Sequence, residues 1–161
     1  MAARDRAEPH EAAGRANVLL LSLSCHHCDA PACLLGCPSR AYEKRPDGIV
    51  IHHEERCLGC RYCEMTCPFG APQFDADKGV MSKCHLCAHR VDEARLPACV
   101  AACPTEALRF APAAEPVPED AERLVPGFAD PAGCLPMLHF RTPAGAKREA
   151  LFRALEEALK R

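Results

Sequence analysis

The sequence predicts a small α+β fold of short β-hairpins and short helices organised around its cysteines. The chain has 161 residues, which is room for one ordinary domain or two very small ones. Aromatic residues make up 5% of it and tryptophan is absent, which excludes a large aromatic core. Cysteine contributes 13 residues, and this density indicates either a disulfide scaffold or metal ligation.

Charge and hydropathy exclude two classes of protein. The 20 Lys and Arg residues are matched by 22 Asp and Glu residues, so binding of nucleic acid by neutralising its phosphates is not expected. No apolar run approaches the roughly 18 residues that cross a bilayer, so no direct membrane span is expected. Residues 1–17 form a polar N-terminal segment that lacks the apolar stretch of a secretory signal. We therefore expect no export by the chain alone, and cysteines that are kept reduced.

Two β-hairpins are predicted between the cysteine-rich loops. In the first, Pro46-Asp47-Gly48 forms the turn between Tyr42–Arg45 and Ile49–His52, because Asp-Gly supplies the positive φ that such a turn needs. The second pairs Gln73-Phe74 with Val80-Met81 around a polar turn that ends at Gly79. Further short strands are expected at Val18–Ser24 and Ala107–Phe110.

The last third of the chain has a different character. Residues 111–141 are expected to form an extended, proline-rich tail over the surface, with an edge strand at Leu135–Phe140. Residues 142–161 are expected to form an amphipathic C-terminal helix, in which Leu151, Phe152, Leu155 and Leu159 share one face. This helix either packs on its own domain or docks to a partner, and the sequence favours neither.

Twelve of the cysteines fall into three quartets, each of which ends in Cys-x3-Cys-Pro. Their spacings are Cys25-x2-Cys28-x4-Cys33-x3-Cys37, Cys57-x2-Cys60-x2-Cys63-x3-Cys67 and Cys84-x2-Cys87-x11-Cys99-x3-Cys103. The middle spacing is that of bacterial ferredoxins, in which the fourth cysteine of a run binds the neighbouring [4Fe–4S] cluster. The proline explains this exchange, because it has no N–H and favours an extended conformation at the preceding cysteine.

This crossing rule assigns the ligands of two clusters. The first cluster takes Cys25, Cys28, Cys33 and Cys67, and the second takes Cys57, Cys60, Cys63 and Cys37. Residues 18–83 are thus predicted to form a ferredoxin-like dicluster domain with backbone amides turned toward sulfur, whose folding depends on its inorganic core. Residues 84–110 are predicted to form an incomplete second ferredoxin-like half, in which Cys84, Cys87, Cys99 and Cys103 are the ligands of a candidate third cluster.

Zinc and disulfides are the alternatives to iron–sulfur clusters. The short Cys60-x2-Cys63 spacing and the repeated prolines disfavour zinc in the first two quartets, whereas the x11 gap of the third quartet suits a zinc-ribbon-like loop. A disulfide scaffold is the least favoured interpretation. Cys134 stands outside the quartets and is interpreted as an isolated thiol, with a spare ligand as the alternative. His26-His27 and His52-His53 are interpreted as supporting or solvated residues beside the loops.

The segment Asn17–Phe110 resembles the iron–sulfur subunits of the dimethyl sulfoxide reductase family of molybdopterin oxidoreductases. The matching stretches are LSLSCHHCDAPACLLGCPSRAY, DGIVIHHEERCLGCRYCEMTCPFGAPQF and GVMSKCHLCAHRVDEARLPACVAACPTEAL. The resemblance implies ferredoxin-like domains with a row of [4Fe–4S] clusters, which transfer electrons between a molybdopterin-containing catalytic subunit and a membrane quinone-interacting anchor subunit. It also implies a cytoplasmic location or membrane association through these partners, with export only if a partner carries the chain.

One departure from the family concerns the third quartet. The family pattern has four quartets, of which the first pairs with the last, and this chain has no cysteine before Cys25. By the crossing rule, Cys84, Cys87 and Cys99 would need a fourth ligand from the missing quartet, and Cys103 would serve the missing cluster. Three explanations stay open: a misassigned or truncated start, a self-contained cluster completed by Cys103 or Cys134, or a third quartet that is empty or holds zinc.

The expected function is one-electron transfer through [4Fe–4S] clusters, with no catalytic site in the chain itself. No acid–base pair, nucleophile–base pair or phosphate-binding loop is recognisable, and clusters of this kind perform the redox chemistry themselves. The alternatives are an accessory or assembly protein that carries iron–sulfur clusters without taking part in turnover, and a zinc-stabilised interaction module. The segment Ala88–Ala98 and the C-terminal helix are the candidate docking elements.

Overall fold

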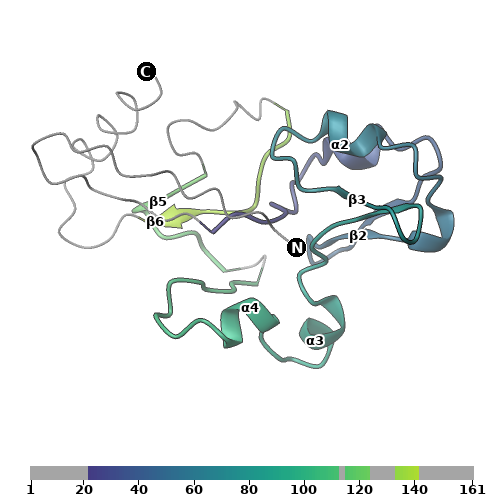
Figure 1. Cartoon of the computed structure of the whole chain (residues 1–161). Coiled ribbons are helices and arrows are strands. Elements are labelled where there is room, and N and C mark those ends of the chain that lie inside the picture. Colours follow the sequence, from purple (N-terminus) through teal and green to yellow (C-terminus); the bar gives the residue numbers. More distant parts are fainter. Residues whose placement is uncertain (1–21, 113–114, 124–132, 142–161) are drawn as a thin grey trace, which may run out of the picture.

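The computed structural model describes residues 22–112, 115–123 and 133–141, which form short helices and three two-stranded antiparallel sheets. In chain order the elements are α1 (Ala32–Leu35), β1 (Tyr42–Lys44), β2 (Val50–His52), the 3₁₀ turn η1 (Glu54–Arg56), α2 (Tyr62–Thr66), β3 (Gln73–Asp75), β4 (Val80–Ser82), α3 (Ala88–Asp92), α4 (Ala98–Ala101), β5 (Ala121–Glu122) and β6 (Phe140–Arg141). This is the small α+β architecture that the sequence predicts (Figure 1). The polar N-terminal segment and the expected C-terminal helix lie outside the described residues.

Two repeats of one plan make up residues 25–82. In each, a cysteine loop leads into a one-turn helix, then to a Cys-Pro step, and then to a hairpin. Strand β1 pairs with β2 in the register Tyr42↔His52, and β3 pairs with β4 in the register Gln73↔Ser82, so both predicted hairpins are confirmed. The turn of the first is closed by a hydrogen bond from the Gly48 amide to the Arg45 carbonyl, and Gly48 has the expected positive φ of 86°.

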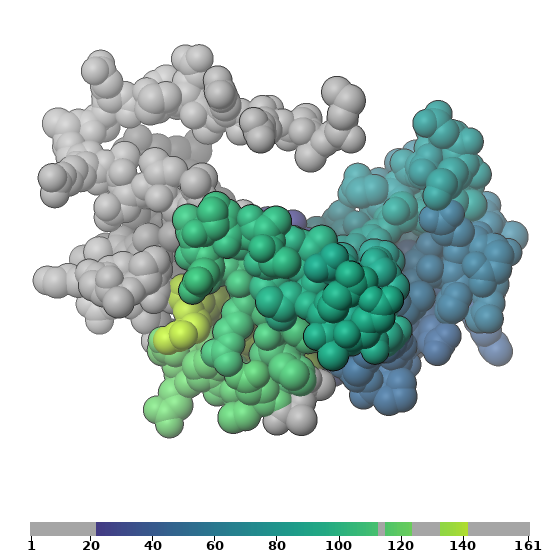
Figure 2. Space-filling model, turned by 90° about the horizontal axis from the view of Figure 1, so that it is seen from below, coloured from purple at the N-terminus to yellow at the C-terminus, as the bar shows by residue number. Residues whose placement is uncertain are grey.

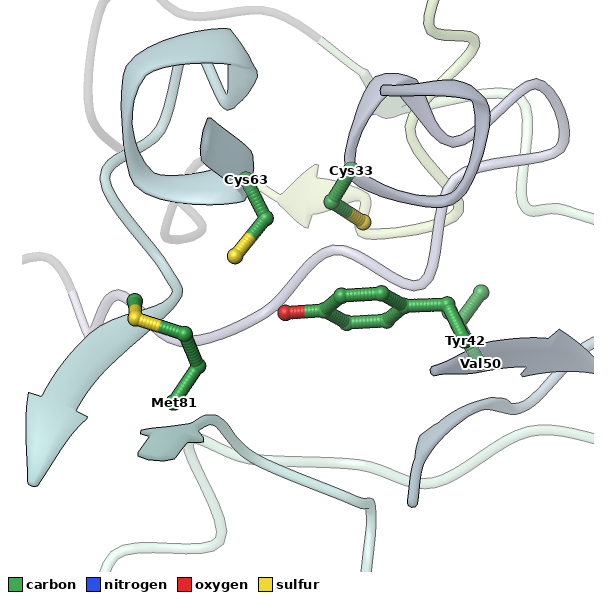
Figure 3. Close-up of a cluster of buried hydrophobic side chains, with 5 residues drawn as sticks. All are labelled: Cys33, Tyr42, Val50, Cys63 and Met81. Carbon is green, nitrogen blue, oxygen red and sulfur yellow. The ribbon is translucent and has the colours of Figure 1, made fainter. Parts of the chain in front are cut away.

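The core lies where the two repeats meet. Helices α1 and α2 pack against each other, and a Cβ on Gly36, directly after α1, would lie 3.1 Å from Thr66 Cγ2 at the end of α2. The buried side chains here are Tyr42, Val50 and Met81 together with two cysteines, Cys33 from α1 and Cys63 from α2 (Figure 3). Cysteines thus occupy positions that an ordinary domain fills with aliphatic residues.

Three strand predictions are wrong or incomplete. The stretch Ala107–Phe110 is not a strand, and the backbone amides of Leu108 and Ala107 instead help to lower the pKa of the Cys103 thiol. Of Val18–Ser24, only residues 22–24 are described, and they are exposed and without strand structure. Of Leu135–Phe140, only Phe140 belongs to a strand, β6, which pairs with β5 in the register Glu122↔Phe140.

The third cysteine loop, with α3 and α4, lies below the two hairpins in Figure 1, and Figure 2 shows it forming the face of the molecule seen from below. A long-range ion pair between Arg45 and Asp92 joins it to the first hairpin, and Arg45 Nη1 donates to Asp92 Oδ2 over 3.1 Å. In the part of the chain that the structure describes, no helix has the length and apolar character needed to cross a membrane.

Candidate metal centre

Four cysteines from both repeats line one cavity. The cavity has an empty volume of about 370 Å³, part of it open to solvent, and Cys25, Cys28, Cys33 and Cys67 all contribute to its wall. The first three belong to the first loop, whereas Cys67 follows α2 in the second repeat. These are the four residues that the crossing rule assigns to the first cluster.

Local backbone structure brings Cys67 across to the first loop. Cys67 caps the end of α2 with an extended conformation, φ −80° and ψ 113°, as the following Pro68 favours. Two residues later Phe69 stacks on His26 of the first loop, with ring centroids 3.9 Å apart. The segment after α2 therefore runs along the first cysteine loop.

The thiols of this cavity are neutral unless a metal binds. Burial, together with the neighbouring thiols Cys25 and Cys67, raises the pKa of Cys28 to about 11 and that of Cys33 to about 12. Without a metal these thiols stay protonated at neutral pH, whereas coordination to a metal removes the proton outright. The cavity is thus lined by soft sulfur donors, which become thiolates only when a metal binds.

Two buried histidines carry ring nitrogens that lack a hydrogen-bond partner in the described part of the chain. His26 and His27 are 4% and 5% exposed and line the same cavity. Burial lowers the pKa of His27 to about 3, so the ring is neutral at pH 7. Its Nδ1 accepts a hydrogen bond from the Val50 amide over 3.0 Å, so the proton is on Nε2.

These unpaired nitrogens fit an iron–sulfur cluster. His27 Nε2 and both ring nitrogens of His26 are buried without a hydrogen-bond partner among the described residues, and each such group costs about 1–3 kcal/mol. The sulfides and thiolates of a cluster are anionic acceptors that would satisfy N–H donors at this place. The interpretation of His26-His27 as solvated is wrong, since both rings are part of the cavity wall.

Three cysteines of the second predicted set also meet at the core. Cys37 and Cys57 pack against the buried group that contains Cys63, and Cys37 lies close enough to Cys63 to raise its pKa further beyond the effect of burial. Backbone amides turn toward their sulfurs: Ala41 N donates to Cys37 Sγ over 3.3 Å, and Gly59 N donates to Cys57 Sγ over 3.4 Å. Cys60, the fourth member of the set, is exposed.

A tyrosine hydroxyl faces this second group. Tyr42 is buried, and its hydroxyl points toward the Cys63 sulfur from the opposite side of the core (Figure 3). It makes no hydrogen bond of normal geometry within the described part of the chain. Like the two histidines, it is a hydrogen-bond donor without an acceptor among the described residues, and it lies beside a predicted cluster site.

The third quartet is only partly brought together. Cys99 and Cys25 both lie close enough to Cys84 to raise its pKa further beyond the effect of burial, and Cys87 Sγ accepts a bond from the Ala98 amide. Cys103 is held separately by the Thr105 hydroxyl at 3.5 Å and by backbone amides, which lower its pKa to about 7. The influence of Cys25 on Cys84 places this loop beside the first cavity.

Two further residues at the first cavity were not assigned to it from the sequence. Cys134 is buried and lines the cavity, although it lies 67 positions after Cys67 in the chain. Lys83 lines it as well and donates to the carbonyl oxygens of Val50 and Cys84. Within the described residues no three His, Cys, Asp or Glu side chains converge as a single metal ion requires; the sulfurs instead surround a void.

Comparison with known proteins identifies the family. Residues 16–113 match the model of the 4Fe-4S dicluster domain. YnfG of Escherichia coli K12, a probable anaerobic dimethyl sulfoxide reductase subunit, is 49% identical over 123 residues, which are 76% of this chain and 57% of that protein. A subunit of the anaerobic dimethyl sulfoxide reductase of Haemophilus influenzae is 55% identical over 92 residues, which are 57% of this chain and 45% of that protein.

A more distant relative is the iron–sulfur subunit of the formate dehydrogenase of Wolinella succinogenes. It is 39% identical over 110 residues, which cover 55% of each protein. The chain thus spans about half the length of the curated relatives it matches.

Proposed function

Because this protein belongs to the family of 4Fe-4S dicluster domains, we propose that it is the iron–sulfur electron-transfer subunit of a molybdopterin oxidoreductase complex. The group that would be bound supplies one-electron redox chemistry, and the protein sets its potential through ligands, hydrogen bonds and exposure. The chain itself contributes no catalytic site to this proposal. Its relatives include subunits of dimethyl sulfoxide reductases and a subunit of a formate dehydrogenase.

The observation that carries the proposal is the cavity lined by Cys25, Cys28, Cys33 and Cys67. Structural zinc needs four ligand atoms about 2.0–2.3 Å from one point. A [4Fe–4S] cluster binds each thiolate through a different iron, so its four sulfurs stand further apart around a filled centre. Sulfurs that line a void, next to buried donors without partners, support the cluster.

The second and third sets extend the proposal. Cys37, Cys57, Cys60 and Cys63 would hold the second cluster, next to the buried Tyr42 hydroxyl. Cys84, Cys87 and Cys99 would hold a third, with Cys103 as the fourth ligand in a self-contained arrangement. Since Cys84 lies near Cys25, and Cys33 and Cys63 share one core, the order in space would be third, first, second.

The row of three cysteine sets also indicates where partner subunits would bind. The segment Ala88–Ala98 carries α3 and the exposed Leu96, and we propose that it docks a partner subunit close to the third loop. A molybdopterin-containing catalytic subunit and a quinone-interacting membrane anchor would lie at opposite ends of the row. Membrane association would then come through the anchor subunit.

The test is the iron content of the full chain prepared without oxygen. We expect about eight iron atoms for two clusters or about twelve for three, with matching acid-labile sulfide. Cys67→Ala should remove the cluster that Cys25, Cys28 and Cys33 bind, and the matched variant Cys37→Ala should remove the other. Electron paramagnetic resonance of the reduced protein distinguishes the two sites.

Two results would contradict the proposal. Colourless protein with zinc or with free thiols would exclude iron–sulfur clusters altogether. Loss confined to the Cys57 site in Cys67→Ala would show that the ligands are not crossed. Co-purification with a molybdopterin-containing subunit would separate an electron-transfer subunit from an accessory carrier of clusters.

A further inference from the structure

A fifth thiol lies at the first cavity. Cys134 is 8% exposed and lines the cavity together with the four cysteines of the first set. It reaches this place because residues 134–137 pair with the first cysteine loop through their backbone. The Ala30 amide donates to the Cys134 carbonyl over 3.0 Å, and the Asp29 amide donates to the Leu135 carbonyl over 2.8 Å.

The contact continues along the loop. The Met137 amide donates to the His26 carbonyl over 3.0 Å. Three backbone hydrogen bonds therefore hold the segment around Cys134 against residues 26–30, which carry Cys28. The position of Cys134 is built into the fold and does not depend on its own side chain.

The backbone contacts place Cys134 beside the part of the first loop that carries Cys28. Of the thiols that act on Cys28, Cys134 has the largest effect, ahead of Cys25 and Cys67. Cys33 lies in α1, beyond the residues to which the segment around Cys134 is hydrogen-bonded. Cys134 therefore lies on the side of the site that Cys28 occupies.

The buried histidines show independently that this cavity accommodates a ligand. His26 is 96% buried, with both ring nitrogens unpartnered, and it forms part of the same wall. Polar atoms buried this deeply normally have partners. A cluster needs four thiolates, and the wall offers five.

We propose that Cys134 is a reserve ligand of the first cluster, which replaces Cys28 on the same iron. In the exchange the Cys28 Sγ–Fe bond breaks and a Cys134 Sγ–Fe bond forms. The proton of the Cys134 thiol moves to the Cys28 thiolate that is released, so no electron is gained or lost. The inference rests on the proposed function, because it requires a cluster in the first cavity.

Paired variants of the full chain, prepared without oxygen, test the exchange. Cys28→Ala should keep the iron of the first site, since Cys134 takes the vacant position, and Cys28→Ala/Cys134→Ala should lose it. Cys33→Ala is the matched control, because the segment around Cys134 is hydrogen-bonded to residues 26–30 and not to α1, and this variant should lose the iron whether or not Cys134 is present. Iron and sulfide content and electron paramagnetic resonance are the measurements.

A second measurement does not depend on the folding of the Cys28 variant. On addition of a chelator, Cys134→Ala should release iron from the first site several-fold faster than the unaltered chain, because a ligand that dissociates has no replacement. Equal iron loss in Cys28→Ala and in the double variant would overturn the inference, and so would equal release rates. A lack of clusters in the unaltered chain would instead refute the proposed function.

Discussion

Gly59 is the position where a single methyl group should damage the fold most sharply. It lies between Cys57 and Cys60, with a positive φ of 66°. A Cβ built there would lie 2.3 Å from the carbonyl oxygen of Gly79, in the turn between β3 and β4. Because the atom it meets is backbone, the clash is relieved only if the cysteine loop or the hairpin moves.

The expected magnitude has two parts. A side chain in the left-handed region costs about 1–2 kcal/mol. Overpacking at a site that cannot adjust adds about 1–3 kcal/mol. Gly70 separates the two parts, since its φ of 59° is similar but a Cβ there would have no atom within 4 Å. Gly59→Ala should therefore destabilise the protein by about 1–3 kcal/mol more than Gly70→Ala.

Anaerobic urea unfolding of the iron-loaded chain, followed by visible absorbance, measures this difference. With a urea dependence of about 1–3 kcal/mol per molar for small proteins, the unfolding midpoint of Gly59→Ala should lie about 1 M below that of Gly70→Ala. Equal midpoints for the two variants would refute the reasoning, because they would show that the close approach of the two loops carries no energetic weight.

Three further predictions concern the sites. Lys83→Met should lower the reduction potential of the first cluster by tens of millivolts in a redox titration, whereas Lys83→Arg should not. The reason is that a unit charge within roughly 10 Å is worth about 1–2 kcal/mol at an effective dielectric constant of 20. About 59 mV per electron corresponds to a tenfold change in the equilibrium constant. Tyr42→Phe should lower the potential of the second cluster more than that of the first, because the buried hydroxyl points toward Cys63 and the Cys63 thiol affects its pKa more than the Cys33 thiol does; an unchanged second potential would exclude a hydrogen bond to that site. Removal of iron by an anaerobic chelator should abolish cooperative thermal unfolding monitored by circular dichroism, because cysteines fill much of the core; a sharp transition in iron-free protein would contradict this.

Local elements were predictable because their causes are local. The three-residue turn Pro46-Asp47-Gly48 specifies the first hairpin without help from the rest of the chain. It places Arg45 opposite Ile49, and the register Lys44↔Val50 follows from it. The same holds for the extended Cys67, whose conformation is favoured by the next residue. The strand expected at Ala107–Phe110 does not form, because strand propensity takes effect only where another strand pairs with the segment, and among the described residues none does.

The sites were predictable to the extent that ligand spacing encodes them. The x2 and x4 spacings of the first loop place Cys25, Cys28 and Cys33 near one another. Cys67 lines the same cavity as these three, and the crossed ligand assignment stays a prediction. The role of His26 was not predictable, because a histidine beside a cysteine can equally face solvent. Its burial depends on Phe69, which comes from the other repeat.

By itself the sequence determined the two hairpins, the cysteine loops and the chemistry of their donors, since these depend on residue type and on neighbours a few positions apart. The tertiary structure decided which distant groups share a cavity: Cys67 and Phe69 on the first loop, Lys83 between the first and third loops, and Cys134 beside Cys28. Backbone hydrogen bonds between residues 26–30 and 134–137 decide the last of these. Such bonds use amides and carbonyls that almost every residue carries, so side-chain spacing does not reveal them.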